Sequence, residues 1–141
     1  MSARLLSLVG DHAALGERVD QLVAVTTEHG FPYWGAQGAI YRGWVQVNNG
    51  DVTEGISLLR SGSAAYRATG AEAWTPHYLA LLARACEFAG QIEEASSLLD
   101  DALSIAERTG ECWFAAELNR HKGQLLLRQG TNPRRNRIAK P

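Results

Sequence analysis

The sequence predicts an all-α fold of about seven antiparallel helices, and three observations carry this prediction. Glycine recurs every twenty residues, at Gly10, Gly30, Gly50, Gly70, Gly90, Gly110 and Gly130. Between these glycines, apolar residues recur at the spacing of one helix face. No segment alternates between apolar and polar residues, so no strand is expected. Because glycine is the usual left-handed cap just past a helix, each block is predicted to be one helix and a tight turn.

Alternate blocks resemble each other, so the full repeat is forty residues long and holds an A helix and a B helix. The B helices align without gaps, with DVTEGISLL at residues 51–59 over QIEEASSLL at residues 91–99. The A helices keep a small residue seven positions before the closing glycine, at Gly43, Ala83 and Gly123. A small residue at one helical position lets a neighbouring helix approach closely.

This order of small and large apolar residues resembles the tetratricopeptide pattern. One unit runs through Ala83, Gly90, Ala95, Leu99 and Ala102. The unit here is longer than the usual thirty-four residues, so each helix is expected to be longer as well. The resemblance implies a tetratricopeptide-like α-solenoid over residues 1–130, followed by a basic tail at 131–141 that we expect to be disordered.

Longer strings are similar to the C-terminal repeat region of large bacterial signalling proteins, which carry a class III nucleotide cyclase domain and an ATPase domain ahead of the repeats. These strings are HGFPYW (29–34), RGW (42–44), AAYRATGAEAW (64–74), PHYLALLA (76–83) and TGECWFAAELNRHKGQLLL (109–127). Neither catalytic domain is present, so no catalytic residue of that family has a counterpart here. The resemblance implies partner binding or regulation by a piece of a longer repeat array.

Composition excludes several classes of function. The formal net charge is −1, so no overall field attracts nucleic acid or anionic lipid, and neither is expected as a partner. No apolar stretch reaches the roughly 18 residues of a membrane span, and the start is too short an apolar run for a signal peptide, so we expect a cytoplasmic protein. Cys86 and Cys112 have no metal spacing and are both expected to be buried thiols.

The sequence offers no catalytic constellation. The four histidines lie in four different blocks, and no HExxH, CxxC or P-loop string occurs. We therefore expect no enzyme activity and no cofactor. The aromatics that open the A helices are expected to pack in the core between helices; they include Trp34, Trp74, Trp113 and Phe114.

Candidate binding residues lie on the A helices, which line the concave face of a tetratricopeptide fold. Tyr41 and Trp44 are the first candidates, because Trp44 aligns with the polar Arg84 and Gln124 of later repeats. Trp44 is therefore expected to be exposed to the groove or to another chain. His121 forms a basic cluster with its neighbours Arg120 and Lys122, which is either a ligand contact or a solvated helix face.

Three functions remain open from sequence alone. The first is a non-catalytic module that binds a polypeptide on its concave A-helix face. The second is a small-ligand sensor whose pocket is closed by Tyr41, Trp44, His77 and Arg84. The third is a self-associating fragment of a larger cyclase/ATPase-type regulator. An enclosed apolar pocket with convergent polar groups favours the sensor, whereas an open groove favours the peptide binder.

Self-association is predicted because neither end of the array has a polar capping helix. The first A helix is reduced to Ser2–Val9, and the last, from Glu111 to Gln129, has no B helix to cover it. A homodimer would bury the leucines at one end, either Leu118, Leu125 and Leu126 or Leu5, Leu6 and Leu8.

Overall fold

The computed structural model describes residues 7–8, 10–29 and 32–130, without the side chains of residues 25–29. Its helices are α2 (His12–His29), α3 (Pro32–Asn48), α4 (Val52–Ala68), α5 (Thr75–Phe88), α6 (Ile92–Thr109) and α7 (Ala115–Gly130), with a short 3₁₀ turn, η1 (Cys112–Phe114), before α7. These described residues contain no strand, so the predicted all-α class is confirmed. The predicted helix at Ser2–Val9 lies almost entirely outside them.

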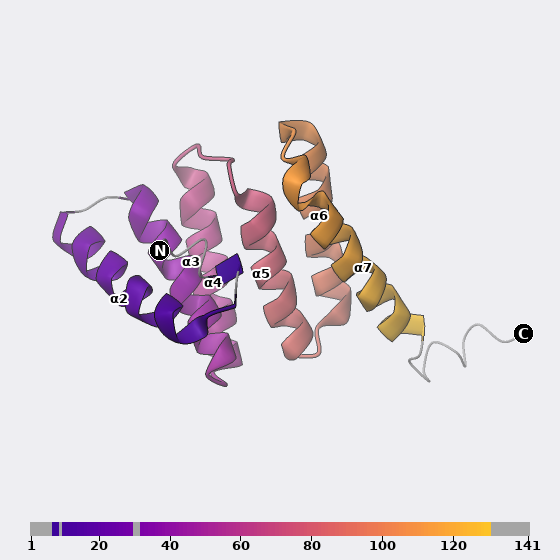
Figure 1. Cartoon of the computed structure of the whole chain (residues 1–141), viewed down its shortest axis with the longest axis horizontal. Helices are drawn as coiled ribbons and strands as arrows, with labels where there is room; N and C mark the ends of the chain where they lie inside the picture. Colours follow the sequence, from indigo (N-terminus) through magenta and orange to yellow (C-terminus); the bar gives the residue numbers. More distant parts are fainter. Residues whose placement is uncertain (1–6, 9, 30–31, 131–141) are drawn as a thin grey trace, which may run out of the picture.

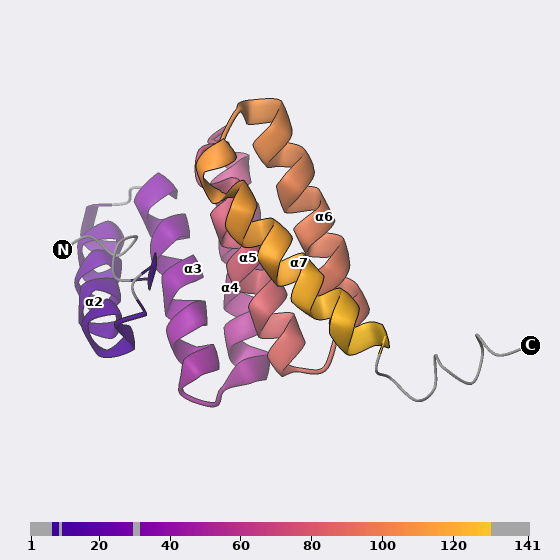
Figure 2. The ribbon, with the colours of Figure 1, turned by 45° about the vertical axis from the view of Figure 1, so that its right-hand side comes forward.

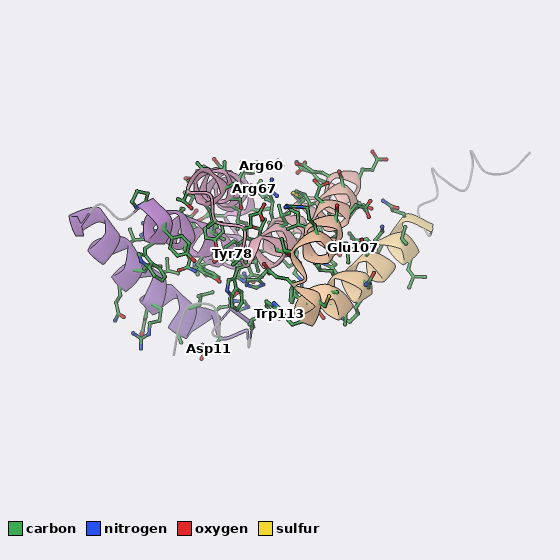
Figure 3. The ribbon with its side chains drawn as sticks, turned by 90° about the horizontal axis from the view of Figure 1, so that it is seen from above. Asp11, Arg60, Arg67, Tyr78, Glu107 and Trp113 are labelled. Atoms are coloured by element: carbon green, nitrogen blue, oxygen red, sulfur yellow. The ribbon has the colours of Figure 1, made fainter. Side chains whose placement is uncertain are left out.

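Successive helices run antiparallel and follow one another in a row from α2 to α7 (Figure 1). Each helix packs against the next, and the A helix α3 also contacts the A helix α5. After a turn of 45°, α2 and α3 still lie side by side, whereas α4 lies behind α5 (Figure 2). Seen from above, Arg60 and Arg67 of the B helix α4 lie on one side, whereas Asp11, just before α2, and Trp113 of η1 lie on the other (Figure 3). The face formed by α3, α5 and α7 is called the A-helix face below.

The twenty-residue glycine register marks the turns as predicted. Gly50, Gly70, Gly90 and Gly110 each end a helix with a left-handed φ, between 77° and 100°, and Gly10 precedes α2 with a φ of 77°. Gly30 lies outside the described residues. The expected cap at Gly130 is wrong, because α7 runs through this residue and its φ is not left-handed.

A very close contact joins α3 to α4 through glycine. A Cβ atom added to Gly55 would lie 2.6 Å from the carbonyl oxygen of Gly43 and 2.9 Å from the backbone nitrogen of Val47. A Cβ atom on Gly43 would lie 2.7 Å from the oxygen of Gly55. The small residue expected at position 43 therefore does admit a neighbouring helix, and the two backbones touch there.

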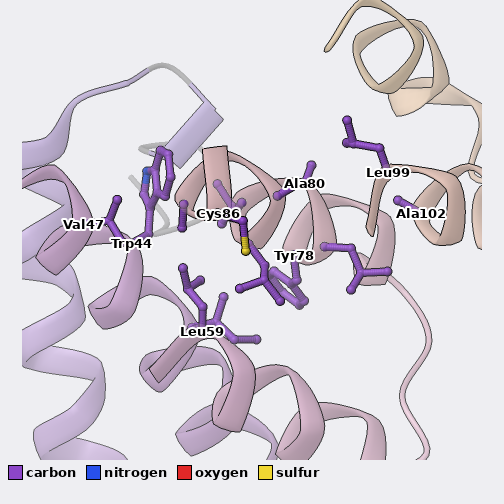
Figure 4. Close-up of a cluster of buried hydrophobic side chains, with 14 of the residues drawn as sticks. Trp44, Val47, Leu59, Tyr78, Ala80, Cys86, Leu99 and Ala102 are labelled. Atoms are coloured by element: carbon purple, nitrogen blue, oxygen red, sulfur yellow. The ribbon is translucent and has the colours of Figure 1, made fainter. Parts of the chain in front are cut away.

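One buried apolar cluster runs through the described helices from Leu15 to Leu125. Figure 4 shows its middle, where Leu59 and Cys86 lie beside Tyr78. The helix-opening aromatics join this core unevenly. Phe114 is buried and Trp74 is half-buried, but Trp34 and Trp113 are exposed, so their predicted place in the core is wrong. Trp34 lies in the first turn of α3. Trp113 lies in η1, where its ring packs against that of Trp74 with the ring centres 4.9 Å apart.

A second expectation, that leucines at the C-terminal end are left for a second copy of the chain to bury, is wrong for two of the three residues named. Leu118 and Leu125 are buried within the chain, because the apolar side of α7 packs onto its neighbours. They are therefore not available to a second copy. Leu126 remains exposed, with 52% of its surface accessible, and so does Leu127. Leu5 and Leu6 lie outside the described residues, and Leu8 is partly exposed.

Replacing Gly55 by alanine is expected to destabilise the protein by about 2 kcal/mol, because the new methyl group forces two helix backbones apart. The matched control is Gly123→Ala, since a Cβ atom at Gly123 meets nothing within 4 Å. In a helix interior, alanine is favoured over glycine by roughly 0.5–1 kcal/mol, so the control should be stabilised. Urea unfolding of both variants measures the difference. The backbone contact would be contradicted if Gly55→Ala lost no stability toward urea, or if Gly123→Ala lost as much stability as Gly55→Ala.

Candidate functional site

The A-helix face holds a cavity of about 170 Å³, here called the A-helix pocket. Its wall combines side chains from three A helices and η1 with two residues from before α2. The apolar part of the wall consists of Leu8, Ala80, Leu81, Phe114 and Leu118. The polar part consists of Ser7, Trp44, His77, Arg84, Glu117 and His121. Repeats that lie far apart in sequence thus build one site.

Four of the six predicted partner-binding residues meet in this pocket, namely Trp44, His77, Arg84 and His121. Tyr41 does not reach it. Its side chain is fully buried behind the wall, with its ring centre 6.4 Å from that of His77. Arg120 is exposed and lies outside the wall, where its Nε donates a hydrogen bond of 2.9 Å to Glu117.

The expected exposure of Trp44 is wrong, because only 4% of its surface is accessible. Phe88 lies nearly parallel to its indole, with the ring centres 6.5 Å apart, and His12 of α2 lies at 6.3 Å. The indole still lines the pocket, and its Nε1 has no hydrogen-bond partner in the described part of the chain. An indole nitrogen can only donate, so Trp44 carries a buried donor that lacks an acceptor within the described residues.

The two histidines of the wall are held differently. The Nε2 atom of His121 lies 2.8 Å from the carboxylate of Glu87, which also pairs with Arg128. His77 sits among aromatic rings, with the ring centres of Phe114 and Trp74 at 5.4 and 6.0 Å. Both histidines are buried, so their imidazole rings are positioned by their neighbours rather than by solvent.

Charge at the rim is largely balanced within the protein. The carboxylate of Glu117 lies 3.5 Å from Arg84 and also accepts from Arg120. The hydrogen bond from Arg120 lowers the pKa of Glu117 below its usual value, so this carboxylate is ionised at neutral pH. Arg84 therefore faces the pocket as one member of an ion pair and not as an isolated cation.

No metal centre is built by the described residues, since none of their His, Cys, Asp and Glu side chains gather in groups of three or more. The hydroxyl of Ser7 lines the same pocket as His77, but it makes no hydrogen bond within the described chain, so no Ser–His nucleophile is formed there. What the wall offers is apolar surface, the indole of Trp44 and a balanced ionic rim.

A larger hollow of about 310 Å³ lies at the turn between α4 and α5. Arg67 and Arg108 line it, but Arg108 is already paired with Glu72, at 3.1 Å. Its apolar wall is limited to Ala71 and Ile105. The A-helix pocket, although smaller, gathers more apolar surface and the predicted residues, and we take it as the candidate site.

Sequence reasoning missed Ser7, Leu8, Ala80, Leu81, Phe114, Glu117 and Leu118 as members of the site. Phe114 and Leu118 were interpreted only as core or interface residues. Ser7 and Leu8 were assigned to a shortened first helix, without any place on the A-helix face. The signal available in the sequence was Gly10, a residue that readily adopts the left-handed conformation and so allows the backbone to turn just before α2.

The described residues thus define an all-α protein with a small pocket on one face of a row of helices. None of their helices is long and apolar enough to cross a membrane. No family model matches the chain, and no solved structure matches it. It is similar to an uncharacterised protein of Rhizobium meliloti (strain 1021), with 26% identity over 129 residues. The match covers 92% of this chain and 12% of that protein, so the chain spans only a small part of its relative.

The two cysteines should react at different rates. Cys86 is buried, which raises the pKa of its thiol, and Cys112 is exposed, so the expectation that both are buried is wrong for Cys112. At pH 8, Ellman's reagent should modify one thiol rapidly in the native protein and the second only after unfolding in guanidinium. The Cys112→Ser variant should lose the rapid phase. Two rapid thiols in the native protein would contradict the burial of Cys86.

Proposed function

We propose that the protein is a non-catalytic, tetratricopeptide-like module that binds a polypeptide partner along its A-helix face. The observation that carries the proposal is the A-helix pocket, to which α3, α5 and α7 all contribute side chains. A binding surface assembled from successive repeats is the usual means by which helical repeat proteins engage their partners. The antiparallel row of helices and the forty-residue repeat support the solenoid interpretation.

The size of the pocket supports a polypeptide over a free small molecule. At about 170 Å³ it falls below the roughly 300 Å³ at which pockets for drug-sized ligands begin. A space of this size accommodates one side chain of an extended partner, whose remaining residues would lie along the face. The sensor alternative, closed by Tyr41, Trp44, His77 and Arg84, is not favoured, because Tyr41 lies behind the wall.

The relative from Rhizobium meliloti supports the idea that such a module operates within a larger protein, since the matched region is 12% of its length. This agrees with the resemblance to the repeat region of cyclase/ATPase-type signalling proteins. In that setting the module would work in the cytoplasm without a cofactor of its own. It would recruit or regulate a protein partner.

Selection of a phage-displayed peptide library on the full chain tests the function. We expect peptides that share an aliphatic residue, and at least a tenfold weaker affinity for the variant Ala80→Leu, which fills the pocket. The matched control is Ala64→Leu, which adds the same side chain to an exposed position on α4 and should bind normally. If no peptide is enriched, or if both variants bind equally well, the A-helix pocket is not a peptide site.

Self-association is proposed as a second property of the module, now through Leu126 and Leu127 on α7, which expose 52% and 73% of their surface. Sedimentation velocity over a dilution series should reveal a reversible dimer. Replacing both leucines by glutamate should weaken it by tenfold or more, because burial of leucine contributes about 1.5–3 kcal/mol per side chain. The control pair Ala116→Glu and Asn119→Glu adds the same charge elsewhere on α7. A monomer at every concentration would refute the dimer.

A further inference from the structure

One side of α7 is uncovered in the described part of the chain, although the corresponding side of α3 is packed. In α3, this side consists of four buried residues that all contact α4, namely Ala36, Ile40, Gly43 and Val47. They follow one helix face. Two repeats later, the same positions of α7 are held by Ala116, Arg120, Gly123 and Leu127, here called the α7 strip. All four residues of the α7 strip are exposed.

Gly123 shows the difference most directly. A Cβ atom on its counterpart Gly43 would lie 2.7 Å from the carbonyl oxygen of Gly55, whereas a Cβ atom on Gly123 would meet nothing within 4 Å. Leu127 exposes 73% of its surface, while its counterpart Val47 exposes 4%. In α5, the corresponding small residue is fully buried, and α6 packs against that helix. A position that is filled in α3 and α5 is therefore open in α7.

We propose that the α7 strip captures an amphipathic helix of another polypeptide, one that carries the pattern of the protein's own B helices. The captured helix would lie along α7 as α4 lies along α3 (Figure 1). None of the four strip residues lines the A-helix pocket, so this inference goes beyond the proposed function.

The B helices specify which helix fits. Each presents a small residue, a large apolar residue four positions later and a second small residue three positions after that. In α4 these residues are Gly55, Leu59 and Gly62, and in α6 they are Ala95, Leu99 and Ala102. Both glycines of α4 meet the backbone of α3, since added Cβ atoms would lie 2.6 Å from the oxygen of Gly43 and 2.9 Å from the nitrogen of Ile40. Larger side chains at the two small positions would keep the helices apart.

The described helices of a second copy do not supply this pattern. The small residues of α4 and α6 are buried inside the protein. The remaining B helix, α2, has Leu15 and Leu22 at the two small positions. In the sequence that follows α7, Arg135 stands at the first small position, forty residues after Ala95. The fitting helix is therefore expected from another polypeptide.

Charge narrows the choice of helix further. With histidine counted as neutral, α7 has a net charge of +2, because Arg120, Lys122 and Arg128 outnumber the single carboxylate of Glu117 by two. Arg120 stands at the position of Ile40 in α3, which meets the second small residue of α4. Complementary charge steers partners together and disfavours wrong ones. We therefore expect the captured helix to be acidic.

The probe is a fluorescein-labelled peptide with the sequence of residues 91–110, which contains α6 and has a charge of −4 from five carboxylates and one arginine. Fluorescence anisotropy with the full-length chain should give at least tenfold weaker binding to Gly123→Leu than to the unmodified protein, because the new side chain fills the contact position. The control Gln124→Leu adds the same side chain at the next exposed residue of α7 and should bind like the unmodified protein. Urea unfolding checks that both variants remain folded.

A reciprocal change in the peptide tests the same contact from the other side. Ala95→Leu in the peptide should weaken binding by tenfold or more, because residue 95 is the first small position of the pattern. Ser97→Leu, at a residue that α6 exposes in the protein, should leave binding unchanged. Since both peptides gain one leucine side chain, a difference between them reports close helix packing and not general hydrophobicity.

Absence of peptide binding to the unmodified protein, or equal binding to Gly123→Leu, would overturn helix capture. Equal affinity of the Ala95→Leu and Ser97→Leu peptides would overturn the required pattern. If the peptide does not bind but Gly123→Leu disrupts a reversible dimer, a second copy covers the α7 strip and the proposed occupant is wrong.

Discussion

The backbone contact between α3 and α4 is the constraint on which the rest of the structure depends. Gly43 and Gly55 bring the two helices so close that a Cβ atom on either would lie within 2.7 Å of the other's carbonyl oxygen, and Gly62 extends the contact toward Ile40. Close-packed interiors do not accommodate an added methyl group without moving whole elements. The position of α3 is therefore fixed from behind by the backbone of α4.

This constraint also sets the orientation of Trp44, which is one residue further along α3 and lines the pocket. Successive residues of an α-helix are about 100° apart, so while Gly43 faces α4, its neighbour Trp44 is turned toward the pocket. The same helix thus uses one side for backbone packing and the next for the indole donor. Because α5 also packs against α3 and supplies His77, Ala80 and Arg84, the shape of the pocket follows from how the A helices are held by the B helices.

Sequence periodicity predicted what depends on local backbone geometry, and failed where the environment is set by neighbours. The helix-ending turns at Gly50 and Gly110 follow from local capping and were predictable. The exposure of Trp44 was inferred by aligning it with Arg84, but Phe88 and His12 pack against the indole, whereas Arg84 is exposed. Leu118 and Leu125 were recognised as one apolar face, yet periodicity does not say which element buries that face.

The electrostatics of the site favour selection by shape and hydrogen bonding over selection by charge. Glu117 offsets Arg84 and also pairs with Arg120, so a charged partner would have to break or share an existing ion pair. Exposed pairs of this kind contribute little and are screened by salt. The buried indole donor of Trp44, in contrast, has its requirement for an acceptor unmet and is shielded from water, which strengthens the hydrogen bond that meets it. Under the proposed function, selection by the pocket would therefore depend on its shape and apolar wall more than on charge.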